Sequence, residues 1–329
     1  MRFDPFGPLV SPLALVVLGG LAWLYLRGAN RPRLTGERVG PVRHGFFALA
    51  VVLLALAFDG PLASAGQRLF FAHQLQHLAI RLLGPFLIAL AHPWPVLRAG
   101  LPRGLRHWLG RVSGYRPVRG AARILRRLDV SFVLLIASLY VWQVPALHNA
   151  AVTMPPLALF THICMVLAGL NFFVATLDRR DGPEHANHRA RILALVGVIL
   201  SNILLGSLTT MKESLLYTAY DIAGRLWGFS PMIDESTGGY TIWVPSSFVI
   251  IVAIMVVFNG WNRAEVRRWN MRHSWSGSNA AALDFPETAQ ELRMKVAVPN
   301  RRLGRTLALI SATMFVTVLI TGTTIIYVY

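Results

Sequence analysis

Two histidines, His73 and His77, stand four residues apart in the stretch FAHQLQHL, inside an otherwise apolar run. In an α-helix, side chains four residues apart lie on the same face, about 5–6 Å from each other. Imidazoles at that spacing can chelate one metal ion. Because ionisable residues are costly inside a membrane and are usually functional there, this pair is the first candidate for chemistry.

Two more histidines are expected at the same depth in the membrane. His148 follows VWQVPAL at the end of the next apolar block, and His162 lies about two turns into the block after that. Four imidazoles from three consecutive spans would then share the outer half of the membrane. The remaining histidines map to the cytoplasmic side and read as surface or interface residues: His44, His92, His107, His185, His188 and His273.

The elements that position these residues are transmembrane helices. The chain has 329 residues, of which 54% are hydrophobic and 14% are charged, and its mean hydropathy is +0.51. Soluble domains carry about 25% charged residues, and a helix needs about 20 apolar residues to cross a bilayer. We therefore predict an all-α polytopic bundle of about eight spans, at 9–27, 42–58, 68–91, 129–149, 156–177, 190–211, 241–260 and 304–328.

Charge in the loops predicts how the bundle is oriented. Arginine-rich loops alternate with nearly neutral ones, and basic loops face the cytoplasm, so both termini are expected outside. The net charge of +17 is thereby explained by topology and not by a nucleic-acid partner. Segment 98–127 is expected to be a basic amphipathic stretch that meets anionic membrane lipid, and 262–305 a basic cytoplasmic loop.

Several kinds of protein and site are disfavoured by the sequence. The single cysteine, Cys164, excludes an internal disulfide and a Cys-x-x-Cys metal site. No Ser–His–Asp order stands out, and no glutamate accompanies the histidine pair as in His-Glu-x-x-His enzymes. We therefore expect a single integral membrane domain over 1–329 that is not an enzyme, and a homo-oligomer stays open.

Three readings of the four histidines remain: a metal site, a bis-histidine haem site, and hydrogen-bonded links between helices. Imidazole suits zinc, copper, iron and nickel, and thioethers favour copper(I). Met154 and Met165 lie nearby in the sequence, and Asp234 is an acidic candidate at the outer rim. Histidine with methionine, and without carboxylates in the spans, favours copper. The rim acids Asp59, Asp221, Asp234 and Glu235 would either guide cations inward or simply be solvated.

Arg81 is one turn beyond His77 on the same helix face. A buried arginine needs a partner, and no acid is predicted at its depth. Asn171, Asn202 or carbonyls freed by Pro85 are candidates, and snorkelling toward the cytoplasmic interface is the alternative.

Five motifs, in this order, resemble the CtaG family of cytochrome c oxidase assembly factors over residues 68–260. They are FAHQLQHLAIRLLGPFLIAL, VWQVPALHNAA, FTHICMVLAGLNFF, SLLYTAYD and PMIDESTGGYTIWVPSS. The resemblance implies a bacterial plasma-membrane protein that helps a haem–copper oxidase mature by handling copper, with oxidase subunits as partners. It matches the family's histidines to His73, His77, His148 and His162, and its aspartate before a glycine and a tryptophan to Asp234.

The chain also departs from the family pattern. Gln74 and Leu78 stand where methionine often follows the first two histidines, and Glu235 and Ile242 replace a glutamine and a methionine. These changes disfavour a methionine-rich copper(I) site but not a histidine site. The span at 304–328 lies outside the matched part. A copper transporter and a haem-binding membrane protein are the alternatives to a copper-carrying assembly factor.

Overall fold

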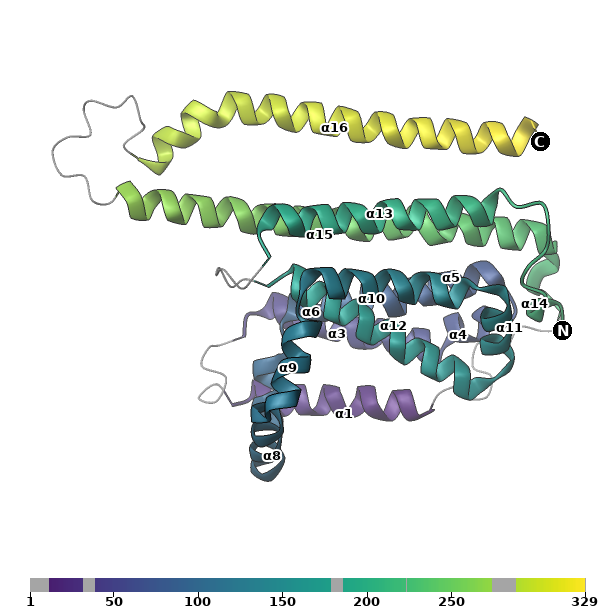
Figure 1. Cartoon of the computed structure of the whole chain (residues 1–329), viewed down its shortest axis with the longest axis horizontal. Helices are drawn as coiled ribbons and strands as arrows, with labels where there is room; N and C mark the ends of the chain where they lie inside the picture. Colours follow the sequence, from purple (N-terminus) through teal and green to yellow (C-terminus); the bar gives the residue numbers. More distant parts are fainter. Residues whose placement is uncertain (1–11, 32–38, 179–185, 223, 274–287, 329) are drawn as a thin grey trace. The chain divides into compact units, whose positions relative to one another are not determined.

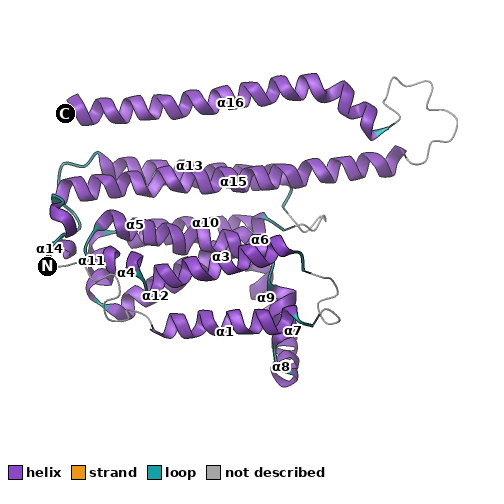
Figure 2. Ribbon diagram, turned by 180° about the vertical axis from the view of Figure 1, so that it is seen from behind, coloured by secondary structure: helices purple, strands orange, loops and turns teal. Residues whose placement is uncertain are grey.

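The computed structural model describes residues 12–31, 39–178, 186–222, 224–273 and 288–328, without the side chains of 271–273, 295–296, 298–300 and 317–328. Helices and loops make up these residues, and no strand occurs among them (Figure 2). The chain divides into two compact units, 1–258 and 259–329. Each unit is described by itself.

The predicted membrane-protein class is confirmed. Among the described residues, six helices are long and apolar enough to cross a membrane, and a bent pair raises the number to seven. The count of eight and the outside position of both termini stay predictions. The helices that form or extend the first seven predicted spans are α1 (Pro12–Ala29), α3 (Pro41–Phe58), α5 (Phe70–Leu78), η1 (Ala79–Leu83), α6 (Gly84–Ala91), α10 (Leu128–Tyr140), α12 (Pro155–Thr176), α13 (His188–Thr210) and α15 (Pro231–His273) (Figure 1).

The third predicted span is a continuous helix built from three segments, α5, η1 and α6. The middle segment, η1, is a π-helix that carries Arg81. Such segments are rare and frequently occur at functional sites. The helix ends where His92 takes a left-handed conformation, with φ of 45°, and Pro93 follows.

The fourth predicted span, 129–149, is not straight. Helix α10 passes into a short 3-10 turn, η2 (Val141–Gln143), and a new helix, α11 (Pro145–Thr153), begins after a bend of 77°. Pro145 explains the break, because proline lacks an N–H and disfavours helical backbone in the residue before it. Val144 accordingly takes extended backbone. His148 therefore lies on a separate short helix and not in the last turn of a straight span.

Close helix contacts hold the bundle of the first unit together. Helix α12 packs on η1 and α6 and on α10, and a Cβ placed on Gly169 would lie 1.9 Å from the backbone oxygen of Arg81. Helices α13 and α15 also lie close together, because a Cβ on Gly239 would lie 2.8 Å from the oxygen of Gly206. The apolar core joins η1, α6, α10, α12, α13 and α15 through residues that include Leu82, Phe86, Leu135, Phe172, Leu195 and Ile250.

The two ends of the bundle in the first unit carry different short helices (Figures 1 and 2). The short helices α4 (Pro61–Gly66), α11 and α14 (Ala219–Ile222) lie at the end where α5 begins. The opposite end, beyond α6, continues into α7 (Trp94–Gly100), α8 (Arg103–Gly114) and α9 (Arg116–Leu125). The predicted basic segment 98–127 therefore consists mainly of helices. Helices α8 and α9 bury no residue, so their arginines lie on the surface.

The second unit holds the end of α15 and the helix α16 (Ala289–Val328). Residues 274–287 of the predicted basic loop lie outside the described residues. The predicted eighth span, 304–328, is helical throughout, but its side chains beyond Val316 are not described. Glu265 in this unit accepts hydrogen bonds from Trp261 and Arg268.

Candidate metal centre

The bundle brings all four predicted histidines together. His73 and His77 come from α5, His148 from α11 and His162 from α12, and all four are buried. The ring centroid of His73 lies 4.2 Å from that of His77, 5.0 Å from that of His148 and 6.2 Å from that of His162. His77 and His162 are 5.6 Å apart. The predicted convergence of these side chains is therefore confirmed as geometry.

Three of the four have ligand atoms at metal-binding spacing. Within the described chain, a ring nitrogen from each of His73, His77 and His162 lies within 4.8 Å of the other two. His148 touches the same rings but is not part of this group. The chemistry of each ring shows why the four are not equivalent.

His73 presents one free lone pair. Its Nδ1 lies 3.0 Å from the backbone oxygen of Gly66 at the end of α4. A carbonyl oxygen has no hydrogen to give, so Nδ1–H must be the donor and Nε2 keeps its lone pair. A backbone carbonyl that orients the ring in this way is typical of histidines that bind metals.

His77 is the most unusual of the four. Only 2% of its surface is exposed, and both ring nitrogens are buried with no hydrogen-bond partner among the described residues. Leaving a buried polar group without a partner costs about 1–3 kcal/mol. A purely structural histidine would be expected to make the hydrogen bond that His77 lacks.

His148 has both ring nitrogens engaged. Nδ1 lies 3.0 Å from the backbone oxygen of Trp142 and must donate to it. Nε2 is then the acceptor, and the hydroxyl of Tyr220 donates to it over 2.8 Å. The lone pair that would bind an ion is therefore occupied by a tyrosine.

The two candidate methionines are in different surroundings. Met165 is fully buried and packs in an apolar cluster with Leu54, Phe58 and Ile80. Met154 caps α11 and is half exposed. Gln74, where the family often has methionine, exchanges amide hydrogen bonds of 2.5 and 3.4 Å with Gln143. This pair ties α5 to the bend in the fourth span.

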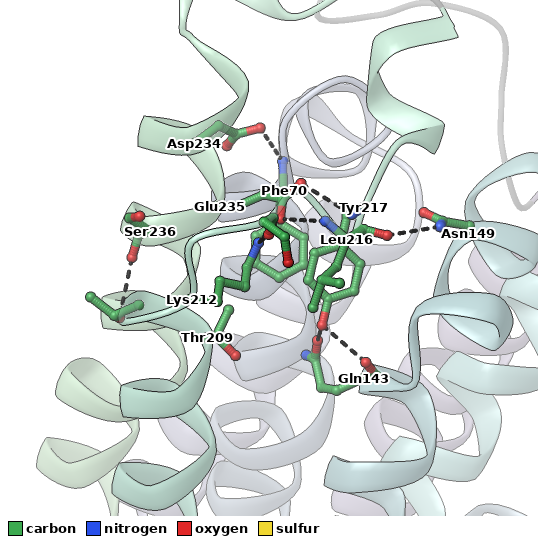
Figure 3. A network of polar contacts seen from close by, with 12 residues as sticks. Phe70, Gln143, Asn149, Thr209, Lys212, Leu216, Tyr217, Asp234, Glu235 and Ser236 are labelled. Atoms are coloured by element: carbon green, nitrogen blue, oxygen red, sulfur yellow. Dashed lines mark hydrogen bonds and ion pairs between the residues drawn. The ribbon is translucent and has the colours of Figure 1, made fainter.

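Asp234, a residue of α15, lies against the first turn of α5, the helix that carries the histidine pair. Its carboxylate accepts a hydrogen bond from the backbone amide of Phe70 over 2.9 Å (Figure 3). It also accepts one from the amide of Phe71 over 3.0 Å and pairs with Arg225. These amides belong to the first turn of α5, where N–H groups have no partner within the helix. Asp234 is not in the group at metal-binding spacing, so its observed contacts position α5.

Glu235, the next residue, holds the segment that connects α13 to α15. It accepts hydrogen bonds from the amides of Leu216, at 3.2 Å, and Tyr217, at 3.0 Å, and pairs with Lys212 (Figure 3). Both Asp234 and Glu235 are completely buried. The idea that these two acids are solvated at the rim or form an open funnel is therefore wrong, because ion pairs and amides enclose them.

The two tyrosines of SLLYTAYD, Tyr217 and Tyr220, belong to the site although they were not predicted as site residues. The Tyr217 hydroxyl donates to the backbone oxygen of Gln143 over 2.9 Å, and Tyr220 reaches His148. Burial raises the pKa of both phenols, with Glu235 adding to the effect at Tyr217 and Asp234 at Tyr220. Both hydroxyls therefore remain protonated donors at neutral pH. Their motif was visible in the sequence, but nothing in it indicated their partners.

Arg81 is buried, with 4% of its surface exposed. Its guanidinium donates to the side-chain oxygen of Asn202 over 3.4 Å, so of the predicted partners Asn202 is the one observed. Asn171 instead donates to the backbone of Leu125. A fixed positive charge therefore follows the histidine cluster one turn farther along the same helix.

The arrangement is suited to binding one cation through neutral imidazoles. Three nitrogens converge, one ring is oriented by a backbone carbonyl, and no carboxylate belongs to the group. Imidazole donors without carboxylates are typical of copper and zinc sites and not of magnesium or calcium sites.

Comparison with known proteins places the chain in a family. A family model described as cytochrome c oxidase caa3 assembly factor matches residues 23–264, which include all four histidines. The uncharacterized proteins Mb0105 of Mycobacterium bovis and MT0111 of Mycobacterium tuberculosis are each 26% identical over 81% of this chain. ML1998 of Mycobacterium leprae is 24% identical over the same share.

The chain spans 40% of the length of each of these mycobacterial relatives. No solved structure matches the chain. The family match covers most of the chain and agrees with the resemblance found in the ordered motifs. The chain belongs to the family of cytochrome c oxidase caa3 assembly factors.

Proposed function

We propose that this protein binds one copper ion through His73, His77 and His162 in the bacterial plasma membrane and passes it to a subunit of the oxidase that it helps to assemble. The observation that carries the proposal is His77, which lies next to two other imidazoles. Its two buried ring nitrogens have no hydrogen-bond partner among the described residues. A bound cation would supply the partner that the fold withholds.

The alternative of structural packing fits this residue poorly. Histidines that link membrane helices do so by donating or accepting hydrogen bonds across the interface. His148 behaves in this way with Trp142 and Tyr220, whereas His77 makes no such bond within the described part of the chain. His77 is therefore the residue whose presence needs a ligand.

Copper is favoured over zinc by the family, and the ligand count is suited to a site that exchanges its metal. A factor for cytochrome c oxidase serves an enzyme whose centres contain copper, and imidazole binds copper well. Three protein ligands leave a position open, whereas a closed tetrahedral site holds its metal. At an open position, a ligand of the recipient subunit can bind the ion before the imidazoles dissociate from it.

Position along the helix supports exchange at one membrane face. His73 and His77 lie three and seven residues after the start of α5 at Phe70, which is about 5 and 11 Å along the helix axis. The basic helices α8 and α9 follow the far end of the same span. By the positive-inside rule, the histidine end is the outer one.

Transport across the membrane is less well supported. A cation moving inward from His77 would next meet Arg81, whose buried charge repels it. A bis-histidine haem is the other alternative, and the absorption spectrum tests it.

The test is the copper content of purified protein from copper-supplemented membranes, beside His77→Ala and a control, His107→Ala. His107 is exposed on α8, so its loss changes the histidine count without touching the cluster. We expect about one copper per chain in the wild type and in the control and little in His77→Ala. Full copper binding by His77→Ala would refute the proposed site, and a Soret band in the spectrum would favour haem.

Transfer is tested separately with the copper-loaded protein and a purified copper-binding domain of an oxidase subunit. Movement of copper to that domain, faster than release to buffer, is the expected result. Copper that binds at the predicted histidines but never moves would leave a metal site and remove the carrier role.

A further inference from the structure

We infer that His148 is a reserve ligand for the ion, held away from it by the hydroxyl of Tyr220. This inference rests on the proposed function and adds a control element to it. At rest the site offers three imidazoles. When the hydrogen bond between Tyr220 and His148 opens, a fourth imidazole becomes available.

The donor and acceptor assignment supports this role. Because Nδ1 of His148 donates to the oxygen of Trp142, the Nε2 lone pair is the one facing Tyr220. The His148 ring centroid is 5.0 Å from that of His73 and 6.2 Å from that of His77. His148 is therefore in the cluster, oriented by a backbone carbonyl as His73 is, and differs in having its lone pair occupied.

Tyr220 lies on a segment that makes hydrogen bonds to two different helices, α15 and α11. We call residues 212–222 and 224–230, which link α13 to α15, the outer strap. On one side, Glu235 binds the amides of Leu216 and Tyr217. On the other side, the side chain of Asn149 on α11 donates to Leu216 and accepts from Ala219.

The same strap is joined to the helix that carries His73 and His77. Arg225 in the strap pairs with Asp234, which caps the first turn of α5. A movement of the strap is thus linked to α5, α11 and α15 together. A recipient subunit that docks on this end of the bundle would meet the strap before it meets the histidines.

The exchange is a competition for one lone pair. In the resting form, the Tyr220 hydroxyl donates to Nε2 of His148. In the engaged form, Nε2 coordinates the ion and the hydroxyl, still protonated, bonds elsewhere. Return of the strap reverses the step and leaves the ion with three ligands, which favours its release to the recipient. No proton or electron is transferred.

The experiment measures copper(I) affinity by competition with a chromophoric chelator in four variants. Tyr220→Phe keeps the ring and removes the hydroxyl, so the Nε2 lone pair of His148 is released. We expect binding about tenfold tighter, which is opposite in sign to the loss caused by removing a group that supports a bound ligand. His148→Ala in the Tyr220→Phe background should abolish that gain, while His148→Ala alone should change affinity little. Tyr140→Phe, which removes a hydroxyl bonded to Ser201 on another part of the bundle, is the matched control.

Unchanged affinity in Tyr220→Phe, or a gain that survives His148→Ala, would overturn the inference. X-ray absorption should count three imidazoles on copper in the wild type and four in Tyr220→Phe. Equal counts in the two proteins would also contradict it.

A measurement without metal separates this inference from the proposed function. In protein labelled with ¹⁵N-histidine, the Nε2 resonance of His148 should move toward that of an unbonded imidazole nitrogen in Tyr220→Phe. No shift would reject the Tyr220 assignment even if copper binds. A clear shift in a protein that binds no copper in any variant would instead keep the hydrogen bond and reject both the reserve ligand and the copper site.

Discussion

The backbone amide of Phe70 donates to the carboxylate of Asp234 over 2.9 Å, between residues 164 positions apart in the sequence. The bond places the first turn of the histidine-bearing helix against the start of α15. Close packing reinforces it, because a Cβ on Gly238 would lie 2.1 Å from the ring of Phe70. The position of His73 and His77 thus depends on a residue that does not touch them.

Replacing Asp234 by alanine should therefore destabilise the protein by about 3 kcal/mol, because it leaves Arg225 buried without its partner and removes the cap of α5. Unfolding of purified protein in mixed micelles measures this. Asp221→Ala is the control, since that acid is more exposed and pairs with the same arginine. Equal losses in the two variants would show that the cap at Phe70 and Phe71 has no special role.

The sequence was sufficient for the helices and for the gathering of the histidines. Hydropathy and length predicted spans at 42–58 and 156–177, and the helices run Pro41–Phe58 and Pro155–Thr176. Spacing on one helix and alternation of loop charge together placed His73, His77 and His162 at one depth, and the structure brings them together. Their role as ligands stays a prediction.

Long-range partners could not be predicted in the same way. The bend before Pro145, the Tyr220 bond to His148 and the burial of Asp234 and Glu235 depend on which helix ends meet in space. Composition makes an acid in an outer loop look solvated. Only the fold shows that backbone amides and an arginine surround Asp234. Only the fold likewise shows that the Nε2 lone pair of His148 accepts a hydrogen bond from Tyr220.

His77→Leu should stabilise the metal-free protein by about 1–2 kcal/mol while it removes copper binding. The reason is that leucine fills the space without two unpartnered polar atoms, and functional sites often reduce stability in this way. His73→Leu is the matched comparison and should not stabilise, because it leaves the Gly66 carbonyl without its donor. Thermal unfolding with and without copper checks both variants, and a destabilised metal-free His77→Leu would contradict the account of that residue.

Arg81→Gln should tighten copper binding by about tenfold, since a buried positive charge near the site repels the cation. The effect should be larger for copper(II) than for copper(I), because the repulsion scales with the charge of the ion. Arg119→Gln, at an exposed position on α9, controls for net charge. Chelator competition with each oxidation state gives the answer, and equal affinities in Arg81→Gln and the wild type would mean that the guanidinium is screened from the site.

Gly169→Ala should separate α12 from the π-helical segment and thereby disturb the site from a distance. The added methyl would lie 1.9 Å from the Arg81 oxygen, so backbone must move. Overpacking of this kind costs about 1–3 kcal/mol. Because His162 is on α12 and His77 is next to the π-helix, the same movement should pull their nitrogens apart and weaken copper binding in protein that remains folded.

Gly45→Ala on α3 is the control, because a Cβ there meets nothing within 4 Å. Copper content and unfolding of the two variants, each purified as a single folded species, decide the matter. Full copper binding in a destabilised Gly169→Ala would show that the ligand geometry does not depend on this helix contact.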